Sequence, residues 1–93
     1  MRLKHQEADI IKTTVIGFDP EAEVFLFGSR TDDSLKGGDI DLLIFSESMN
    51  LRSKLQLKSS LFEKLEEQEI DVIIEKNRSK PFIIYVLQKA IQL

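Results

Sequence analysis

Apolar residues along the chain recur first at helical and then at strand spacing. Over residues 3–15 they fit one face of a helix, and Gly17 follows as a stop signal. The run at residues 23–27 is short and rich in β-branched and aromatic side chains, which predicts a buried strand that ends at Gly28. Residues 30–38 are polar and end in two glycines, so we expect a loop there.

Two later strands share one feature, a carboxylate near the start of an apolar run. Residues 39–45 predict a second strand, in which Asp39 and Asp41 are the polar positions. Residues 70–74 predict a third strand, in which Asp71 has the corresponding place. The apolar remainder of each strand is expected to be buried, whereas the two starts remain open for chemistry.

Two more helices are predicted from apolar positions at helical spacing. Residues 51–66 carry leucines on one face and charged side chains on the other, which indicates an amphipathic crossover helix. Pro81 suits the first turn of a last helix, whose apolar positions are Phe82, Ile83, Val86, Leu87, Ala90 and Ile91. Such a stripe is more often core than interface, but in so small a chain part of it could face a partner.

The polar residues beside the apolar runs predict how the strands are arranged. If Ser29 at the end of the first strand and Asp39 at the start of the second share one edge, these strands run antiparallel. If Asp71 reaches the same edge, the third strand runs parallel to the second, through a right-handed crossover. We therefore predict an α/β (α+β) fold, with a three-stranded mixed sheet and three helices, as a single domain over residues 1–93.

Composition narrows the classes of protein. Of the 93 residues, 42% are hydrophobic and 31% are charged, and no apolar stretch is long enough to span a bilayer. We expect a cytoplasmic protein, because the first residues lack the apolar core of a secretory signal. The lack of cysteine excludes disulfides, thiolate zinc sites and cysteine nucleophiles. A net charge of −3 argues against broad binding to duplex nucleic acid.

The spacing of Asp39 and Asp41 indicates a site for a divalent cation. Side chains alternate along a strand, so both carboxylates face the same space. Two such charges ~5–6 Å apart repel by about 3 kcal/mol at an effective dielectric near 20. Mg²⁺ removes this penalty, because carboxylate oxygens are the ligands that it prefers.

The set of residues suits nucleotidyl transfer by two metal ions. Asp39 and Asp41 would hold both ions, and Asp71 would bind the ion nearer the acceptor hydroxyl and assist its deprotonation. Gly28 lets the backbone approach the β- and γ-phosphates, and the Ser29 hydroxyl with nearby N–H groups donates hydrogen bonds to them.

Three segments together resemble a known family. They are Phe27-Gly28-Ser29-Arg30, the run from Gly38 to Ile44 that contains Asp39-Ile40-Asp41, and Ile70-Asp71-Val72. All three, in this order, are similar to the minimal nucleotidyltransferases (MntA-like antitoxins) of the DNA polymerase beta-like superfamily. The resemblance covers residues 24 to about 75 and implies the nucleotidyltransferase fold.

The resemblance also implies a reaction and a partner. It implies Mg²⁺ and a nucleoside triphosphate, most often ATP, with Asp39, Asp41 and Asp71 as metal ligands and Gly28 and Ser29 on the phosphates. It further implies an antitoxin that silences a HEPN-domain ribonuclease toxin, either by contact or by adding AMP to a tyrosine. A homo- or hetero-oligomer is compatible with that role.

Two other interpretations compete with an enzyme. In the first, the same fold neutralises a toxin by contact alone, and the acidic pair Asp32 and Asp33 in the loop favours this binding module. In the second, the chain is a structural α/β domain whose aspartates are solvated polar positions at strand starts.

Several charged residues are left without a role at this stage. Arg30, Lys36 and Arg78 could reach a phosphate, but basic side chains at the surface are usually only solvated. His5 lies on a charged helix and is expected at the surface.

Overall fold

The computed structural model describes residues 1–35 and 38–93, and in them it contains three α-helices, four strands and one 3₁₀ helix. In chain order these are α1 (His5–Phe18), β1 (Glu23–Phe27), η1 (Gly28–Thr31), β2 (Ile40–Phe45), α2 (Leu51–Lys64), β3 (Ile70–Glu75), α3 (Pro81–Leu87) and β4 (Ile91–Gln92). The polar segment after β1 therefore begins with a short helical turn rather than an irregular loop.

The strands form one mixed sheet in the order β3-β2-β1-β4. β1 and β2 are antiparallel, and β2 and β3 are parallel, so the predicted strand directions are confirmed. In this register Asp41 on β2 lies between Phe27 on β1 and Asp71 on β3. The end of β1 and the starts of β2 and β3 thus meet at one edge of the sheet.

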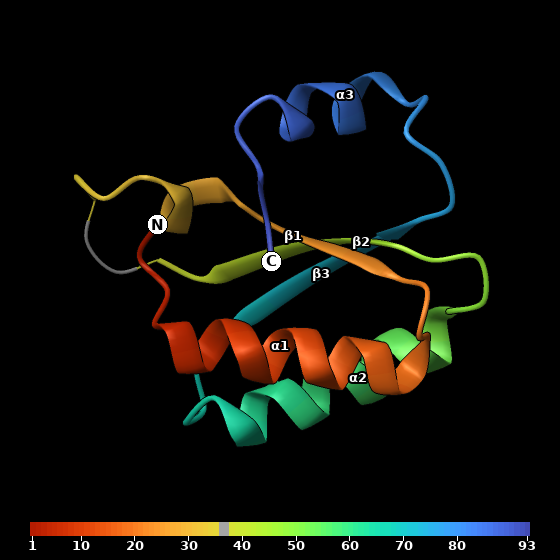
Figure 1. The fold of residues 1–93 in the computed structure, drawn as a ribbon, viewed down its shortest axis with the longest axis horizontal. Coiled ribbons are helices and arrows are strands. Elements are labelled where there is room, and N and C mark those ends of the chain that lie inside the picture. The colour runs from red at the N-terminus through yellow and green to blue at the C-terminus, as the bar shows by residue number, and fades with distance from the viewer. Residues whose placement is uncertain (36–37) are drawn as a thin grey trace.

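Helices cover both faces of the sheet. Figure 1 shows α1 and α2 below the strands and α3 above them. The larger core lies on the α1 and α2 side and includes Ile11, Val15, Leu26, Ile40, Leu42, Ile44, Leu57, Leu61 and Val72. The smaller one joins Leu43 and Phe45 of β2 to Ile83 and Val86 of α3. Because side chains alternate along a strand, Asp41 shares the face of Leu43 and points to the α3 side.

The last strand differs from the prediction from sequence. Helical spacing of apolar residues continues through Ile91, yet α3 ends at Leu87, and Ile91 pairs with Leu26 on β1 instead. Without this pairing β1 would be an edge strand, with open N–H and C=O groups. The Leu93 N–H also donates to the Val24 carbonyl, at 3.0 Å. Closing this edge therefore outweighs one more turn of helix.

The end of α2 also differs by two residues. The helix stops at Lys64, and Glu66 and Glu67 take left-handed conformations with φ of 60° and 62°. The Glu67 N–H donates to the Phe62 carbonyl at 2.8 Å, which closes the last turn. This reversal directs the chain into β3.

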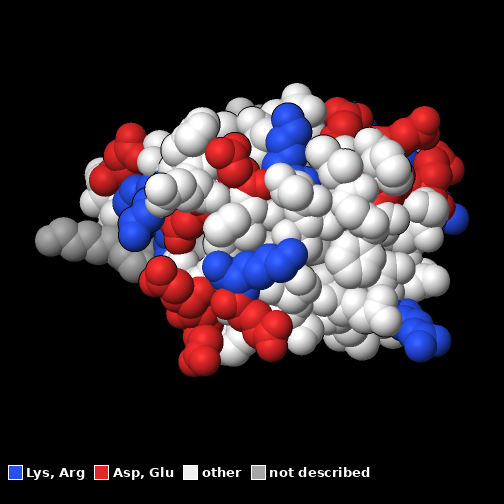
Figure 2. Space-filling view, turned by 60° about the horizontal axis from the view of Figure 1, so that its bottom comes forward, with Lys and Arg blue, Asp and Glu red and all other residues white. Residues whose placement is uncertain are grey.

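The surface on the α1 and α2 side carries charges of both signs. Figure 2 shows basic and acidic side chains interspersed there, with uncharged surface between them. Within residues 1–35 and 38–93, the helices all fall short of the length and apolarity needed to cross a membrane.

Candidate functional site

Gly28 brings the backbone directly against Asp41. β1 ends at Phe27, which pairs with Asp41, and Gly28 then turns the chain with a φ of +77°. A Cβ atom at this position would overlap the Asp41 carboxylate oxygen Oδ2 and lie 3.1 Å from its Cγ. Only glycine combines this left-handed conformation with so close an approach. The glycine is thus a requirement of the site and not only a loop residue.

Ser29 has a matching contact with the other end of the loop. Gly38 also has a left-handed backbone, with a φ of +86°, and a Cβ there would overlap the Ser29 Oγ. Gly38 directly precedes Asp39. The Ser29 hydroxyl is therefore held next to the start of β2, as the sequence interpretation requires for a phosphate contact.

Asp41 and Asp71 are neighbours on the same face of the sheet. They are paired in the parallel register of β2 and β3. Burial raises the pKa of Asp41, and the negative charges of Asp71 and Asp39 raise it further. Asp39 precedes β2 and is exposed, as is Asp71. The structure therefore brings Asp41 and Asp71 together, with Asp39 close enough to act on Asp41 through its charge.

The carboxylates provide a donor set that suits Mg²⁺ only in part. Among the residues that the structure describes, no three acidic or histidine side chains are grouped so that they could hold a metal ion by themselves. Mg²⁺ at nucleotide sites is commonly held by one or two carboxylates plus substrate phosphates and water. The adjacent Asp41 and Asp71 fit that requirement, and Asp39 would have to turn towards them to become a third ligand.

Arg30 connects the loop to the rest of the domain, a role that sequence reasoning did not assign. Its Nε donates to the Gly38 carbonyl at 3.1 Å, Nη1 donates to the Arg2 carbonyl at 3.0 Å, and Nη2 donates to Gln68 Oε1 at 3.0 Å. Gln68 in turn donates to Glu7 Oε2 at 2.6 Å. The guanidinium thus positions the loop through three acceptors within the protein.

Arg2 reinforces the same loop from the N-terminal segment. Its Nη2 donates to the Ser29 carbonyl and its Nε to the Asp32 carbonyl, both at 3.0 Å. The Arg2 N–H also donates to the Arg30 carbonyl at 2.7 Å. Two arginines therefore hold the carbonyl groups of Ser29 and of the loop residues that follow it.

Arg30→Lys is expected to loosen this loop although it keeps the charge. One ammonium group cannot reach three acceptors that the planar guanidinium spans. We expect the free energy of unfolding to fall by about 1–2 kcal/mol. The Asp32 N–H, which donates to the Ser29 carbonyl at 3.1 Å, should exchange faster with deuterium. Denaturant titration and hydrogen exchange measure both effects, and an equal loss in Arg52→Lys, at an exposed position of α2, would contradict this role.

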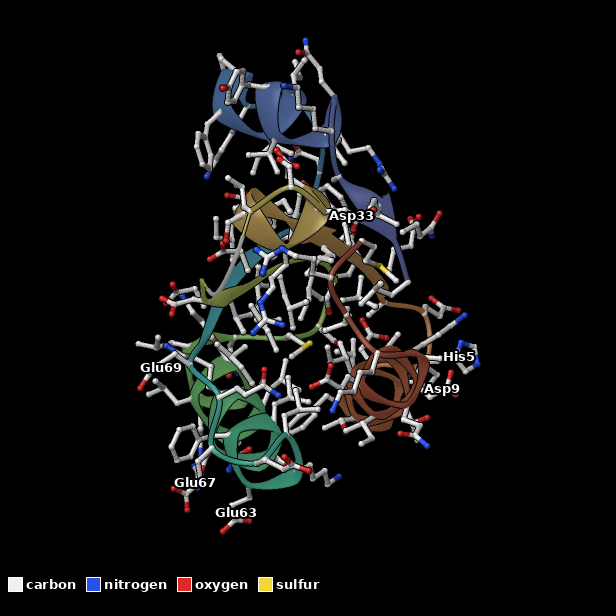
Figure 3. All side chains as sticks on the ribbon, turned by 90° about the vertical axis from the view of Figure 1, so that its left-hand side faces the viewer. His5, Asp9, Asp33, Glu63, Glu67 and Glu69 are labelled. Atoms are coloured by element: carbon white, nitrogen blue, oxygen red, sulfur yellow. The ribbon has the colours of Figure 1, made fainter. Side chains whose placement is uncertain are left out.

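The remaining charged candidates lie away from the acidic site or serve local structure. The Arg78 guanidinium stacks over Phe45 at 4.2 Å and pairs with Glu23 at 2.8 Å. Lys36 lies outside the described residues. His5 is at the surface, as expected, and Figure 3 shows it beside Asp9 on the outer side of α1.

The structure also shows what the two acidic residues of the loop contact. Asp32 accepts hydrogen bonds from the Ser34 hydroxyl at 2.6 Å and the Ser34 N–H at 2.9 Å. These bonds, the side-chain one first, lower the pKa of Asp32. Figure 3 shows Asp33 beside η1. Asp32 therefore stabilises a local turn, and Asp33 pairs with the N-terminal ammonium group.

A mixed sheet with a glycine-serine bend packed on a strand aspartate defines a nucleotidyltransferase-type α/β domain. The chain belongs to the nucleotidyltransferase domain family, whose model matches residues 8–93. The nucleotidyltransferase family that the sequence motifs suggested is thereby confirmed.

A solved structure shows the same fold. It is a crystal structure of a mutant of the toxin–antitoxin MntA–HpeT, and the chain that matches is 17% identical in sequence. The match covers 91% of this chain and 70% of that one, with a TM-score of 0.72. No curated protein is significantly similar in sequence.

Proposed function

We propose that this domain is a Mg²⁺-dependent nucleotidyltransferase that moves AMP from ATP to a hydroxyl group on a protein partner. The observation that carries the proposal is the packing of Gly28 against Asp41, with Asp71 paired to Asp41 on the same face. A structural domain has no need to place repelling carboxylates beside a glycine that permits close backbone approach. A bound cation would offset that repulsion and could in turn bind the phosphates of a nucleotide.

In the proposed reaction each residue of the site has a separate role. The Ser29 hydroxyl and nearby backbone N–H groups bind the β- and γ-phosphates, so they retain the leaving pyrophosphate. Asp41 and Asp71, with Asp39 once it turns towards them, would hold two Mg²⁺ ions, and these ions would neutralise charge on the phosphates and lower the pKa of the acceptor hydroxyl. Asp71 takes the hydroxyl proton as the acceptor oxygen bonds to the α-phosphorus and the bond to pyrophosphate breaks.

The comparison with MntA–HpeT supports a toxin as the kind of partner. That complex is a toxin–antitoxin pair, which supports an antitoxin role for this domain. We propose a HEPN-domain toxin in the cytoplasm as the acceptor of AMP. The modification would attach a charged group to one of its tyrosines and so inactivate it.

Transfer of label from ATP to the partner tests this proposal. The wild-type domain and a double variant, Asp39→Asn with Asp41→Asn, are each incubated with the candidate toxin, Mg²⁺ and ATP labelled at the α-phosphate. We expect label on the toxin with the wild type and a loss of at least ~10²-fold in rate with the double variant. Equal labelling by both proteins would show that these carboxylates do not carry the reaction.

A second function, inhibition by contact alone, is favoured by the acidic loop. Asp32 and Asp33 are exposed, and Asp32 adds negative charge beside Ser29, where a triphosphate would bind. If contact alone is the mechanism, the double variant inhibits the toxin as well as the wild type does and no label is transferred. Inhibition that depends on both ATP and the carboxylates would exclude this alternative.

A further inference from the structure

Helix α2 exposes a line of apolar side chains that has no role in the function described so far. Leu51 is 70% exposed, Leu55 57% and Phe62 38%. With Lys58, which is half-buried, they follow one another at intervals of four, three and four residues. Residues at these intervals lie in one line along a helix, and the spacing is typical of a helix that packs against another helix. These four residues are called the α2 stripe below.

The α2 stripe lies on the outer side of the domain. Leu57 and Leu61 of the same helix are fully buried in the core beneath the sheet. Lys64 faces α1, because its Nζ donates to the Thr14 hydroxyl at 3.4 Å. A helix has about 3.6 residues per turn, so the stripe points roughly away from Lys64 and from α1. Since α2 contacts β3, the outer strand of the sheet, the stripe looks outwards from the β3 side of the domain.

The charges along α2 are arranged in an order that disfavours the isolated helix. Residues 51–58 contain three basic residues and no acidic one, whereas residues 63–69 contain four glutamates and one lysine. The dipole of a helix disfavours cations near its start and anions near its end. Figure 3 shows Glu63, Glu67 and Glu69 around the end of α2, on the side away from α1. The one lysine, Lys64, faces α1, so the outer side of this end is acidic.

We propose that the α2 stripe binds the α2 stripe of a second copy of this chain, with the two helices antiparallel about a twofold axis. Of the two possible directions, only the antiparallel one places the basic start of each helix beside the acidic end of the other. Leu51 then packs against Phe62 of the second copy. Lys58 lies opposite Leu55, where its aliphatic stem covers apolar surface while its ammonium group reaches water.

One charge pair supports this register. Arg52 and Glu63 are exposed on the same flank of the stripe, near its two ends. In an antiparallel pair of helices the like flanks meet, so Arg52 of each copy lies next to Glu63 of the other. The twofold symmetry makes this contact twice. A parallel pair would instead bring the two basic starts together and the two acidic ends together.

The proposed dimer leaves the acidic site open. Asp41 shares the face of Leu43 and points to the α3 side of the sheet, whereas α2 packs on the opposite face. The dimer would therefore present two copies of the site, and it does not depend on the proposed transfer reaction. Because each copy contributes only three exposed apolar side chains, the interface is small. We expect a Kd of roughly 10–100 µM, which is typical of a weak association.

Sedimentation of the wild-type protein at concentrations from about 1 to 500 µM tests for this association. We expect the average mass to rise with concentration from that of a monomer towards that of a dimer. Leu55→Lys should weaken association by at least ~10-fold, because it places a second ammonium group opposite Lys58 and removes an apolar contact. Ile84→Lys is the matched control, since Ile84 is 53% exposed on α3 and makes the same change of charge away from the stripe.

Exchange of the paired charges tests the antiparallel direction. Arg52→Glu and Glu63→Arg should each weaken self-association by about tenfold, because each places like charges together twice. Mixed in equal amounts, the two variants should associate with each other about as tightly as the wild type does, because both contacts then join opposite charges. Neither substitution should lower the denaturant midpoint of the monomer, since each removes a charge that disfavours α2.

Each other outcome overturns the proposal. Wild-type protein that stays monomeric throughout the range does so, even if a different protein is found to bind the stripe. Association that Leu55→Lys leaves unchanged, or that Ile84→Lys weakens equally, places the contact elsewhere. Unchanged self-association of both charge variants would indicate a different direction of the helices. None of these measurements involves ATP, Mg²⁺ or transfer, so failure here leaves the proposed function standing.

Discussion

Asp41→Asn is expected to abolish nucleotide transfer and at the same time to make the protein more stable. The carboxylate at position 41 lies between Phe27 and Asp71 and is half-buried. An amide has almost the same shape but carries no charge, so it is a much weaker ligand for Mg²⁺. We expect the transfer rate to fall by at least ~10²-fold.

The gain in stability comes from the charges that surround Asp41. Burial and the charges of Asp71 and Asp39 raise its pKa, which means that the folded state disfavours its ionised form. The neutral amide removes this penalty and can donate a hydrogen bond to the Asp71 carboxylate. Because the site is partly open to solvent, we expect a gain of only about 1 kcal/mol in the free energy of unfolding.

Denaturant unfolding with a chelator present measures that gain, and the same experiment with Mg²⁺ and ATP measures the loss of function. Ligands should stabilise the wild type and not the variant. Glu47→Gln, which removes one negative charge at an exposed position, is the control and should change neither property. A destabilised Asp41→Asn would show that the carboxylate serves the fold and not a ligand.

The directions of the strands could be predicted because the polar residues at the ends of the apolar runs were expected to meet in one site. Ser29 follows one apolar run, whereas Asp39 and Asp71 stand at the starts of two others. Their convergence at one edge allows only one set of directions for three strands. The observed antiparallel and parallel pairs are those directions. Here the polar residues at the ends of the runs specify the sheet more than the apolar ones do.

Other features depend on contacts between residues distant in the chain, which spacing does not reveal. Ile91 fits a helical stripe and a strand equally well, and only the open edge of β1 decides between them. Arg30 could be a phosphate ligand until its acceptors on Gly38, Arg2 and Gln68 are known. The exposure of the α2 stripe likewise becomes known only once α1 and the sheet are placed.

The close approach of Gly28 to Asp41 is another contact between residues distant in the chain that spacing does not reveal. Substitution of Gly28 is therefore expected to have a large effect on activity. Gly28→Ala should remove most transfer activity while the domain stays folded. The left-handed backbone costs an alanine about 1–2 kcal/mol. The added Cβ would meet the end of the Asp41 side chain, which can turn aside at little cost.

That rotation is expected to inactivate the site, because it moves the Asp41 carboxylate away from Asp71 and from any bound cation.

Gly38→Ala should act through the contact between Gly38 and Ser29. The added Cβ would displace the Ser29 hydroxyl and weaken the binding of inorganic tripolyphosphate. Gly17→Ala is the opposite control: a Cβ there would have no neighbour within 4 Å, so the α1 helix should gain about 0.5–1 kcal/mol. Transfer assays and unfolding curves on the three variants decide the matter. Full activity in Gly28→Ala, with only its stability reduced, would show that transfer does not depend on the observed position of the Asp41 carboxylate.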